Sequence, residues 1–278
     1  MNRLTVRNAC AAALIVGLAA TTAACSSSSG STSSSSKAAQ KDISIAADAS
    51  MALGSAQIAM TTSTTVGTQK NSTVAGGVVA FDGSTGNIML IVGGGSTRIE
   101  EHVANGIIYI QVSGTNVPAN VKGKWIKVAM TDTATLQKLG VSGLPPVGSI
   151  LNQLKTIGGT AVNTGKVTVA NKVFTKYVVT VSRTELIAKA TKLYGATSNS
   201  VKALTAAPAD THATIEIYVN SSGLISREVE SLSLPVSGKQ SKTMTDIALA
   251  NYGASISIAT PPAKDIIDAR SLVGSSTK

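Results

Sequence analysis

The sequence predicts an α+β fold in which one large, strongly bent antiparallel sheet carries short helices against one face. Val, Ile, Ala, Thr, Ser and Gly dominate the composition and aromatic residues make up only 3%, which favours strands joined by tight turns. Apolar residues alternate with a period of two along two long stretches, and helical spacing is confined to short segments beside them. Most connections between the strand-like runs are too short for the helical crossovers that parallel strands need.

The chain begins with the layout of a secretory signal peptide, predicted for residues 1–24. Two arginines precede a run of ten apolar residues, Ala11–Ala20, which is too short for a stable membrane span of about 20 residues. Small residues then lead to Cys25, in an order that resembles a bacterial lipobox, although Thr22 stands where most lipoboxes carry Leu. We expect Cys25 to receive a diacylglycerol; the alternative is an ordinary signal peptide cut near Ala24, with a free thiol.

The predicted organisation after the signal peptide is a short tether and one folded domain. Residues 25–41 are expected to form the lipidated Cys25 and a Ser-rich tether, because Ser/Gly stretches behave as flexible coil. Residues 42–278 are expected to form a single domain, and a split into two domains near residue 158 is the alternative. Cys10 leaves with the signal peptide, so Cys25 has no partner for a disulfide within the mature chain.

The charge of the chain is strongly positive. The formal net charge is +10, and +8 remains after the two arginines of the signal peptide are lost. Such a protein is attracted to anionic lipid headgroups and envelope polymers, unless its scattered lysines serve only for solubility. Basic stretches interleaved with aromatic residues are missing from the sequence, so nucleic acid is not an expected partner.

The first half of the predicted domain is a helix followed by a meander of strands. Asp42–Leu53 has roughly helical apolar spacing, and Gly54 can end that helix. Turn residues separate the strands, and Asn105-Gly106 is the strongest hairpin signal among them. The predicted strands are Ala56–Thr65, Thr73–Phe81, Asn87–Val92, Thr97–Val103, Ile107–Val112 and Lys124–Ala129.

The second half of the predicted domain mixes short helices with further strands. Ser182 and Glu185 form a capping box at the start of one helix. The predicted helices are Asp132–Leu139, Ser149–Ile157 and Arg183–Tyr194, residues 195–208 are irregular or weakly helical, and Ala263–Leu272 is a closing helix or an extended tail. The predicted strands are Thr160–Ala170, Lys172–Val181, His212–Val219, Leu224–Leu234, Ser241–Tyr252 and Ser255–Ala259.

Two of the predicted strands, Asn87–Val92 and Ile107–Val112, are apolar on both faces. A sheet with one face in water alternates cleanly between apolar and polar residues, so both faces of these strands must meet apolar groups. Helices can cover one face, and either a second layer or a ligand cavity can cover the other. The candidate residues for the lining of such a cavity are Ile88, Leu90, Ile108, Ile110, Val112, Trp125, Leu151 and Leu154.

An ordered set of weak motifs resembles a known family. The lipobox, tether and first helix precede a strand with Lys124-Trp125-Ile126-Lys127-Val128, and short helices surround Pro145. Further motifs follow at Tyr177-Val178-Val179, Ile217-Tyr218-Val219-Asn220 and Asn251-Tyr252-Gly253. In spacing and order, residues 42–268 resemble the actinobacterial lipid-carrier lipoproteins of the LppX/LprG type, which are similar in fold to LolA-like carriers. The resemblance implies an open half-barrel whose helices close the concave face over lipid acyl chains, lipoglycans or triacylglycerols.

Residues that could carry catalysis or hold a metal are sparse. The chain has two histidines, His102 and His212, without the spacing of a metal site, and a Gly-x-Ser-x-Gly nucleophile elbow is missing. The carboxyls of Glu228 and Glu230 share one strand face, which we expect to be solvated. We expect the same for the strand that carries His102 between polar neighbours.

The predicted function is therefore binding without catalysis, and neither a cofactor nor a metal is expected. We expect a monomeric lipoprotein at the extracytoplasmic face of the plasma membrane, anchored in the outer leaflet through an N-terminal diacylglycerol. Its expected ligand is a lipid or lipoglycan held in an apolar cavity. The alternative is an envelope sensor or structural module that binds a protein partner.

Overall fold

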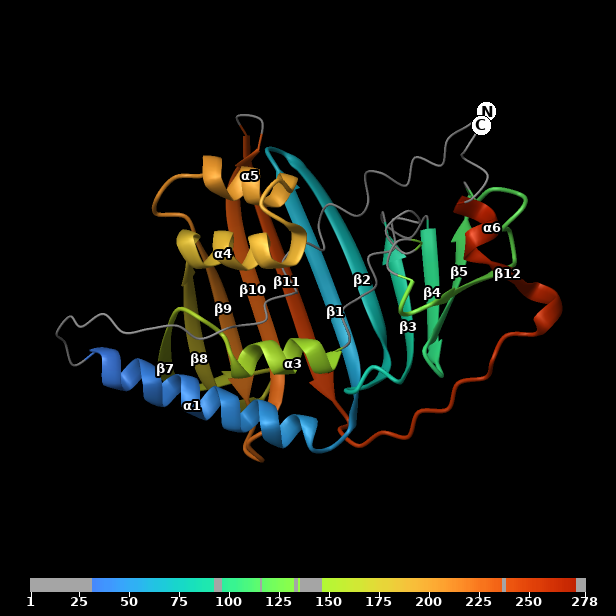
Figure 1. Ribbon diagram of the computed structural model, residues 1–278. Helices are drawn as coiled ribbons and strands as arrows, with labels where there is room; N and C mark the ends of the chain where they lie inside the picture. Colours follow the sequence, from blue (N-terminus) through green and yellow to red (C-terminus); the bar gives the residue numbers. More distant parts are fainter. Residues whose placement is uncertain are drawn as a thin grey trace.

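The computed structural model describes residues 32–92, 97–115, 117–132, 135, 147–236 and 239–273, and Figure 1 shows their arrangement. The signal peptide, Cys25 and the first residues of the predicted tether lie outside these ranges, as does most of the predicted helix Asp132–Leu139.

The first helix is longer than predicted. Helix α1 spans Thr32–Met51, so it begins ten residues before Asp42 and includes the last part of the predicted tether. Tertiary contacts explain this difference: Ala39 is buried, the backbone N–H of Ala161 donates to Ser36 Oγ at 3.0 Å, and Gln40 Nε2 donates to the carbonyl of Gly159 at 2.8 Å. The expected flexible tether between residues 32 and 41 is therefore wrong, because these residues are held against the start of β7.

The described strands form one open sheet. Its order is β12-β6-β5-β4-β3-β2-β1-β11-β10-β9-β8-β7, and β12 and β7 are its two edges. Two antiparallel meanders, β1–β6 and β7–β11, meet where β1 pairs with β11. The strands are β1 (Ser55–Val66), β2 (Gln69–Ala80), β3 (Thr85–Val92), β4 (Thr97–Ala104), β5 (Ile107–Gly114), β6 (Trp125–Ala129), β7 (Thr160–Val169), β8 (Lys172–Ser182), β9 (His212–Val219), β10 (Ile225–Val236), β11 (Lys239–Ala250) and β12 (Ile266–Asp268). The predicted fold class, an α+β protein with a large sheet that does not close into a barrel, is confirmed.

One expected strand in the C-terminal part is wrong. Ser255–Ala259 is not a strand, because β11 is already paired on both sides, with β1 and β10. The chain instead continues to β12, which pairs parallel to β6. The sheet is thus antiparallel except at this edge.

Most of the described helices lie over one half of the sheet, whereas α6 packs at the other end, against β6 and β12. Besides α1, the helices are α3 (Val147–Lys155), α4 (Arg183–Tyr194), α5 (Asn199–Ala206) and α6 (Ala269–Val273), and a short 3-10 turn covers Ala263–Asp265. In Figure 1, α1, α3, α4 and α5 lie on the same side of the sheet, over the half that contains β7–β11. The predicted capping box starts α4: Ser182 Oγ accepts from the backbone N–H of Glu185, whose carboxylate accepts from the N–H of Ser182 at 2.8 Å.

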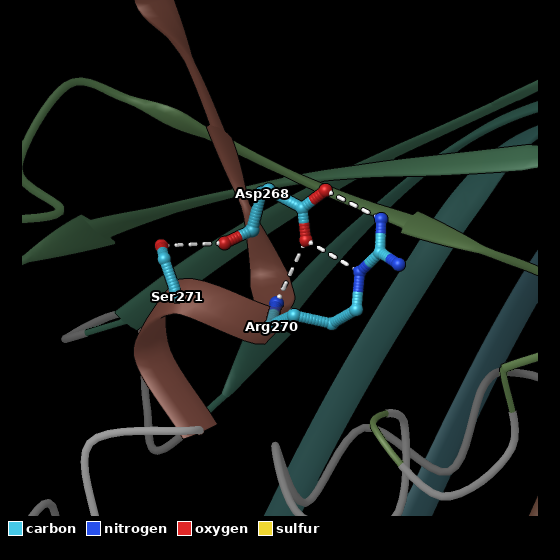
Figure 2. A network of polar contacts seen from close by, with 3 residues as sticks. All are labelled: Asp268, Arg270 and Ser271. Carbon is cyan, nitrogen blue, oxygen red and sulfur yellow. Dashed lines mark hydrogen bonds and ion pairs between the residues drawn. The ribbon is translucent and has the colours of Figure 1, made fainter.

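The last helix, α6, is capped by a local polar network. Asp268, at the end of β12, accepts from the backbone N–H of Arg270 at 2.9 Å and from its guanidinium; Figure 2 draws these contacts as dashed lines. Ser271 Oγ donates to the carbonyl of Asp268 at 2.7 Å. The hydrogen bonds from Arg270 lower the pKa of Asp268 to about 2, which is the expected effect of donors on a carboxylate. The predicted closing segment Ala263–Leu272 is thus a turn, a short strand and a helix.

The face of the sheet that carries the helices is called the inner face here, and the opposite face the outer face. Buried residues on the inner side form two clusters. The larger cluster joins α1, α3, α4 and α5 to β1, β2, β3 and β7–β11, and includes Ile43, Leu151, Val179 and Ile217. The smaller cluster joins β5, β6 and α6 and includes Ile110. Two separate apolar clusters therefore line one continuous sheet.

The pairing of β2 with β3 brings the two backbones very close at Gly77. A Cβ placed on Gly77 would lie 1.9 Å from the carbonyl oxygen of Asn87. Only glycine fits this contact, because the atom that it would strike belongs to the backbone and cannot rotate away. Gly77 pairs with Ile58 and with Ile88, so this contact links the central strands to the half of the sheet that contains the smaller cluster.

Candidate functional site

The inner face brings most of the predicted cavity-lining residues to one side of the sheet. Cross-strand pairing places Ile88 of β3 next to Glu101 of β4, and Glu101 next to Ile110 of β5, and paired residues on neighbouring strands project from the same face. The larger cluster contains Ile88, Leu151 and Leu154, and the smaller contains Ile108, Ile110 and, half-buried, Val112. Leu90 pairs with Ala75 and Ile99, and its side chain lies outside the described part of the chain.

Trp125 belongs to the opposite face. Ile126 pairs with Ile110, so Trp125, one residue earlier, projects from the outer face beside Gln111. Its ring packs on that of His102, with ring centroids 4.5 Å apart. Trp125 is therefore separated by the sheet from the other predicted residues.

His102 takes part in a half-buried polar group on this outer face. His102 Nε2 lies 2.9 Å from Glu100 Oε1 and 3.3 Å from Asn87 Nδ2. The solvated strand face expected around His102 is therefore partly covered, because Trp125 shields the imidazole.

Three glutamates project from the inner face into the interior. Glu228 and Glu230 of β10 are 9% and 6% exposed, and Glu101 of β4 is 9% exposed. The expected solvated face for Glu228 and Glu230 is wrong. The physical reason is register: they pair with Ile217 and Ile215 of β9, which are core residues under the helices.

Glu230 belongs to a row of polar side chains that crosses three strands. It pairs with Thr245 of β11, and Thr245 pairs with Thr62 of β1. Both threonines are buried, and their hydroxyl oxygens lie 3.3 Å apart. Together with Lys189, which reaches this region from α4, the residues Glu228, Glu230, Thr245 and Thr62 are called the interior polar cluster below.

Burial controls the charges of this cluster. It raises the pKa of Glu228 to about 7, and burial together with the charge of Glu228 raises the pKa of Glu230 well above its ordinary value, an effect that Lys189 partly offsets. Burial also lowers the pKa of Lys189, against the opposing influence of Glu185 and Glu230. Among the described residues, Glu228 Oε2 and Lys189 Nζ are buried atoms without a hydrogen-bond partner. The cluster therefore keeps an unused acceptor and an unused donor.

Glu101 is the buried carboxyl nearest the boundary between the two apolar clusters. Its neighbours across the strands are Ile88, in the larger cluster, and Ile110, in the smaller one. Burial raises the pKa of Glu101 to about 7, so an appreciable fraction of this carboxyl is neutral near neutral pH.

The outer face of the same strands carries charges that are paired. Lys176 Nζ lies 2.8 Å from Glu216 Oε1, and Tyr218 donates its hydroxyl to Glu216 Oε2 at 2.6 Å. Arg227 donates to both carboxylate oxygens of Asp246, at 2.8 and 2.6 Å. Burial alone would raise the pKa of Glu216, but the hydrogen bonds from Lys176 and Tyr218 bring it below its ordinary value. These charges serve the sheet as structural ion pairs.

Within the described residues, no group of three or more His, Cys, Asp or Glu side chains is arranged to hold a metal ion. None of the described helices has both the length and the hydropathy that crossing a membrane requires.

Comparison with known proteins adds a set of distant likenesses. No protein-family model matches the chain, and no curated protein matches it. Among solved structures, the chain is similar to the lipoprotein LppX of Mycobacterium tuberculosis, with 13% identity, a TM-score of 0.45, and coverage of 80% of this chain and 99% of that one. It is also similar to LprF of Mycobacterium bovis, with 14% identity, a TM-score of 0.41, and coverage of 81% and 98%.

A third similar structure is the MucA/MucB complex of Pseudomonas aeruginosa, with 14% identity, a TM-score of 0.30, and coverage of 77% of this chain and 58% of that one. LppX is of the type that the sequence resembles. At these identities and TM-scores the likenesses do not bear on function, which is argued below from the chain itself.

The interior carboxyls were missed because charged residues are usually exposed. The strand pattern nevertheless contained a signal. Leu232 and Leu234 lie two and four residues after Glu230, and a strict period of two places all of them on the face of Glu228. Ile99 and Val103 flank Glu101 at the same spacing.

Proposed function

We propose that this protein is an exported lipoprotein, anchored by Cys25 in the outer leaflet of the plasma membrane, that binds or carries a lipid or lipidated molecule against the inner face of its sheet. The observation that carries the proposal is the inner face itself. Apolar side chains line it from β7 to β6, in two separate clusters, on a sheet that is not closed into a barrel.

The physical basis is the burial of acyl chains between the sheet and its covering segments. Each methylene group removed from water contributes about 0.8 kcal/mol, so a single long acyl chain has ample driving force. The inner face also has small residues at Ala56, Ala75, Gly77 and Ala161, all in β1, β2 or β7. Binding alone is proposed, without a catalytic role for any residue.

Native mass spectrometry tests the proposal directly. Protein purified from its own membranes without detergent exchange is expected to carry a bound lipid mass that is lost on organic extraction. A protein that carries no lipid, and that takes up none when mixed with an extract of those membranes, would contradict the proposal.

A matched pair of substitutions on β5 locates the binding surface. Val112 and Gln111 are adjacent and both half-buried, but Val112 faces the inner side and Gln111 the outer side. We expect Val112→Trp to lower the lipid-bound fraction several-fold by filling space on the inner face, and Gln111→Trp to leave it unchanged. Equal losses in both variants, or no loss in Val112→Trp, would place the lipid elsewhere.

The membrane anchor is tested separately. Cys25→Ala is expected to move the protein from the membrane fraction to the soluble fraction, with unchanged circular dichroism, because Cys25 precedes α1 in the sequence and the substitution leaves the side chains of the described core unchanged. A variant that remains tightly bound to membranes after a high-salt wash would show that another feature anchors the chain.

A further inference from the structure

The interior polar cluster stands out because it interrupts an apolar face. Glu230, Thr245 and Thr62 form one cross-strand row, and Glu228 projects from the same face two residues from Glu230. Directly opposite residues in a sheet lie about 5 Å apart, so the row presents polar atoms at regular, short intervals. The helices α4 and α5 pack over this part of the sheet, against β8, β9 and β10.

Two atoms of the cluster have unused hydrogen-bonding capacity. Glu228 Oε2 and Lys189 Nζ are buried and lack hydrogen-bond partners among the described residues. Buried polar groups in native proteins are nearly always hydrogen-bonded, and leaving one unpaired is costly. A ligand group that donates would satisfy the carboxyl oxygen, and a ligand group that accepts would satisfy the amino group.

Charge selects what kind of group fits. Glu230 interacts electrostatically with both Glu228 and Lys189, so it lies close enough to influence either side of the cluster. An anionic ligand group would meet two carboxyls, and a cationic group would meet the amine of Lys189. A hydroxyl group is neutral and both donates and accepts, so it suits all three side chains.

We propose that Glu228 and Lys189, together with Glu230, form an internal hydrogen-bonding site for the hydroxyl groups of a neutral glycerolipid. This inference rests on the lipid-binding function proposed above. The glycerol group, with hydroxyls on neighbouring carbons, reaches more than one of these side chains. The acyl chain then lies along the apolar residues of the same face, such as Ile217 and Ile247, the neighbours of Glu228 on β9 and β11.

Three probes with the same acyl chain test the site on the delipidated full-length protein. They are 1-monooleoylglycerol, methyl oleate, which lacks hydroxyl groups, and oleic acid, which is anionic. Dissociation constants are measured by displacement of a fluorescent acyl probe. We expect wild-type protein to bind monooleoylglycerol about tenfold more tightly than methyl oleate, because the additional hydrogen bonds of the hydroxyl groups commonly lower a dissociation constant by about that factor.

Variants then connect this preference to the named residues. Glu228→Leu and Lys189→Met are each expected to reduce the tenfold preference severalfold and to leave the affinity for methyl oleate unchanged. Glu228→Gln keeps a donor and an acceptor in the same place and should retain most of the preference. Glu216→Gln is the matched control, because Glu216 lies on the outer face of the neighbouring strand, and it should change neither affinity.

Each result decides between the two proposals. Equal wild-type affinities for monooleoylglycerol and methyl oleate, tighter binding of oleic acid than of monooleoylglycerol, or a preference that survives both Glu228→Leu and Lys189→Met would overturn the hydroxyl site and leave lipid binding intact. Wild-type protein that binds none of the three probes would overturn lipid binding itself. If Glu228→Leu does not fold, Lys189→Met provides the test alone, and a preference that survives Lys189→Met would overturn the hydroxyl site.

Discussion

The two faces of β9, β10 and β11 place charged side chains in different environments. On the outer face, Arg227 and Asp246 form a bidentate ion pair, and Glu216 is paired with Lys176. One residue away from Arg227, Glu228 enters the interior, where its Oε2 has no partner among the described residues. Strand alternation alone separates the two environments, because successive side chains point to opposite faces.

This difference indicates what each face contributes. Half-exposed ion pairs add little to stability, because water and salt screen them, and they keep the outer face soluble and well ordered. A buried carboxyl without a partner destabilises the fold, so its position is costly unless binding uses it. Natural proteins often trade stability for function in this manner, and the following predictions test whether the inner face of this protein does so.

The largest expected effect comes from the apolar part of the inner face. Ile217 is fully buried between Tyr177 and Glu228, and Ile217→Ala should lower the free energy of unfolding by about 2–5 kcal/mol. Thr214→Ala, on the outer face of the same strand, should change it by less than about 1 kcal/mol. Urea unfolding measures both values. Similar losses for the two variants would show that stability does not reside mainly on the inner side.

The second largest effect is a dependence of stability on pH. The pKa values of Glu228 and Glu101 are raised by burial from 4.5 to about 7, so between these values the folded state binds more protons than the unfolded state. The free energy of unfolding therefore falls as pH rises from about 4.5 to about 7, by up to roughly 3 kcal/mol for each carboxyl, and changes no further above that range on their account.

Glu228→Gln provides the control for this prediction, because an amide of similar shape does not titrate. Denaturant midpoints measured every half pH unit should show a shallower decline in this variant, whereas Glu216→Gln on the outer face should keep the wild-type slope. A wild-type protein whose stability rises between pH 5 and pH 7 would contradict the buried position of these acids.

Local sequence signals were sufficient for most of the fold. Alternating apolar residues and turn residues such as Asn105-Gly106 predicted the strands of both meanders, and Ser182 with Glu185 predicted the start of α4. Long-range contacts explain the failures. The Ser-rich start of α1 is helical because Ser36 and Ala39 dock near β7, and β12 forms only where three residues meet β6.

The candidate site was harder to predict because residue type competed with position. The alternation of side chains along β10 places Glu228 on the inner face, yet the preference of charged residues for water suggested that its side chain is exposed to solvent. The same alternation along β6 places Ile126 on the inner face and Trp125 on the outer face. For the apolar candidates Ile88, Ile108 and Ile110, the apolar side chain and the alternation along the strand both predict burial, and these residues lie on the inner face.

The smallest expected effect concerns the outer ion pair, and it completes the comparison. Arg227 and Asp246 are both about one-third exposed, so Arg227→Met should lower the free energy of unfolding by about 1 kcal/mol or less at low salt, and by still less in 0.5 M NaCl. A double-mutant cycle with Asp246→Asn isolates the pair from other changes. Because Glu228 on the same strand is buried and its Oε2 has no hydrogen-bond partner among the described residues, Glu228→Leu should instead raise the stability at pH 8. A coupling free energy above about 2 kcal/mol for the outer pair, or a loss of stability in Glu228→Leu, would contradict the roles assigned to the two faces.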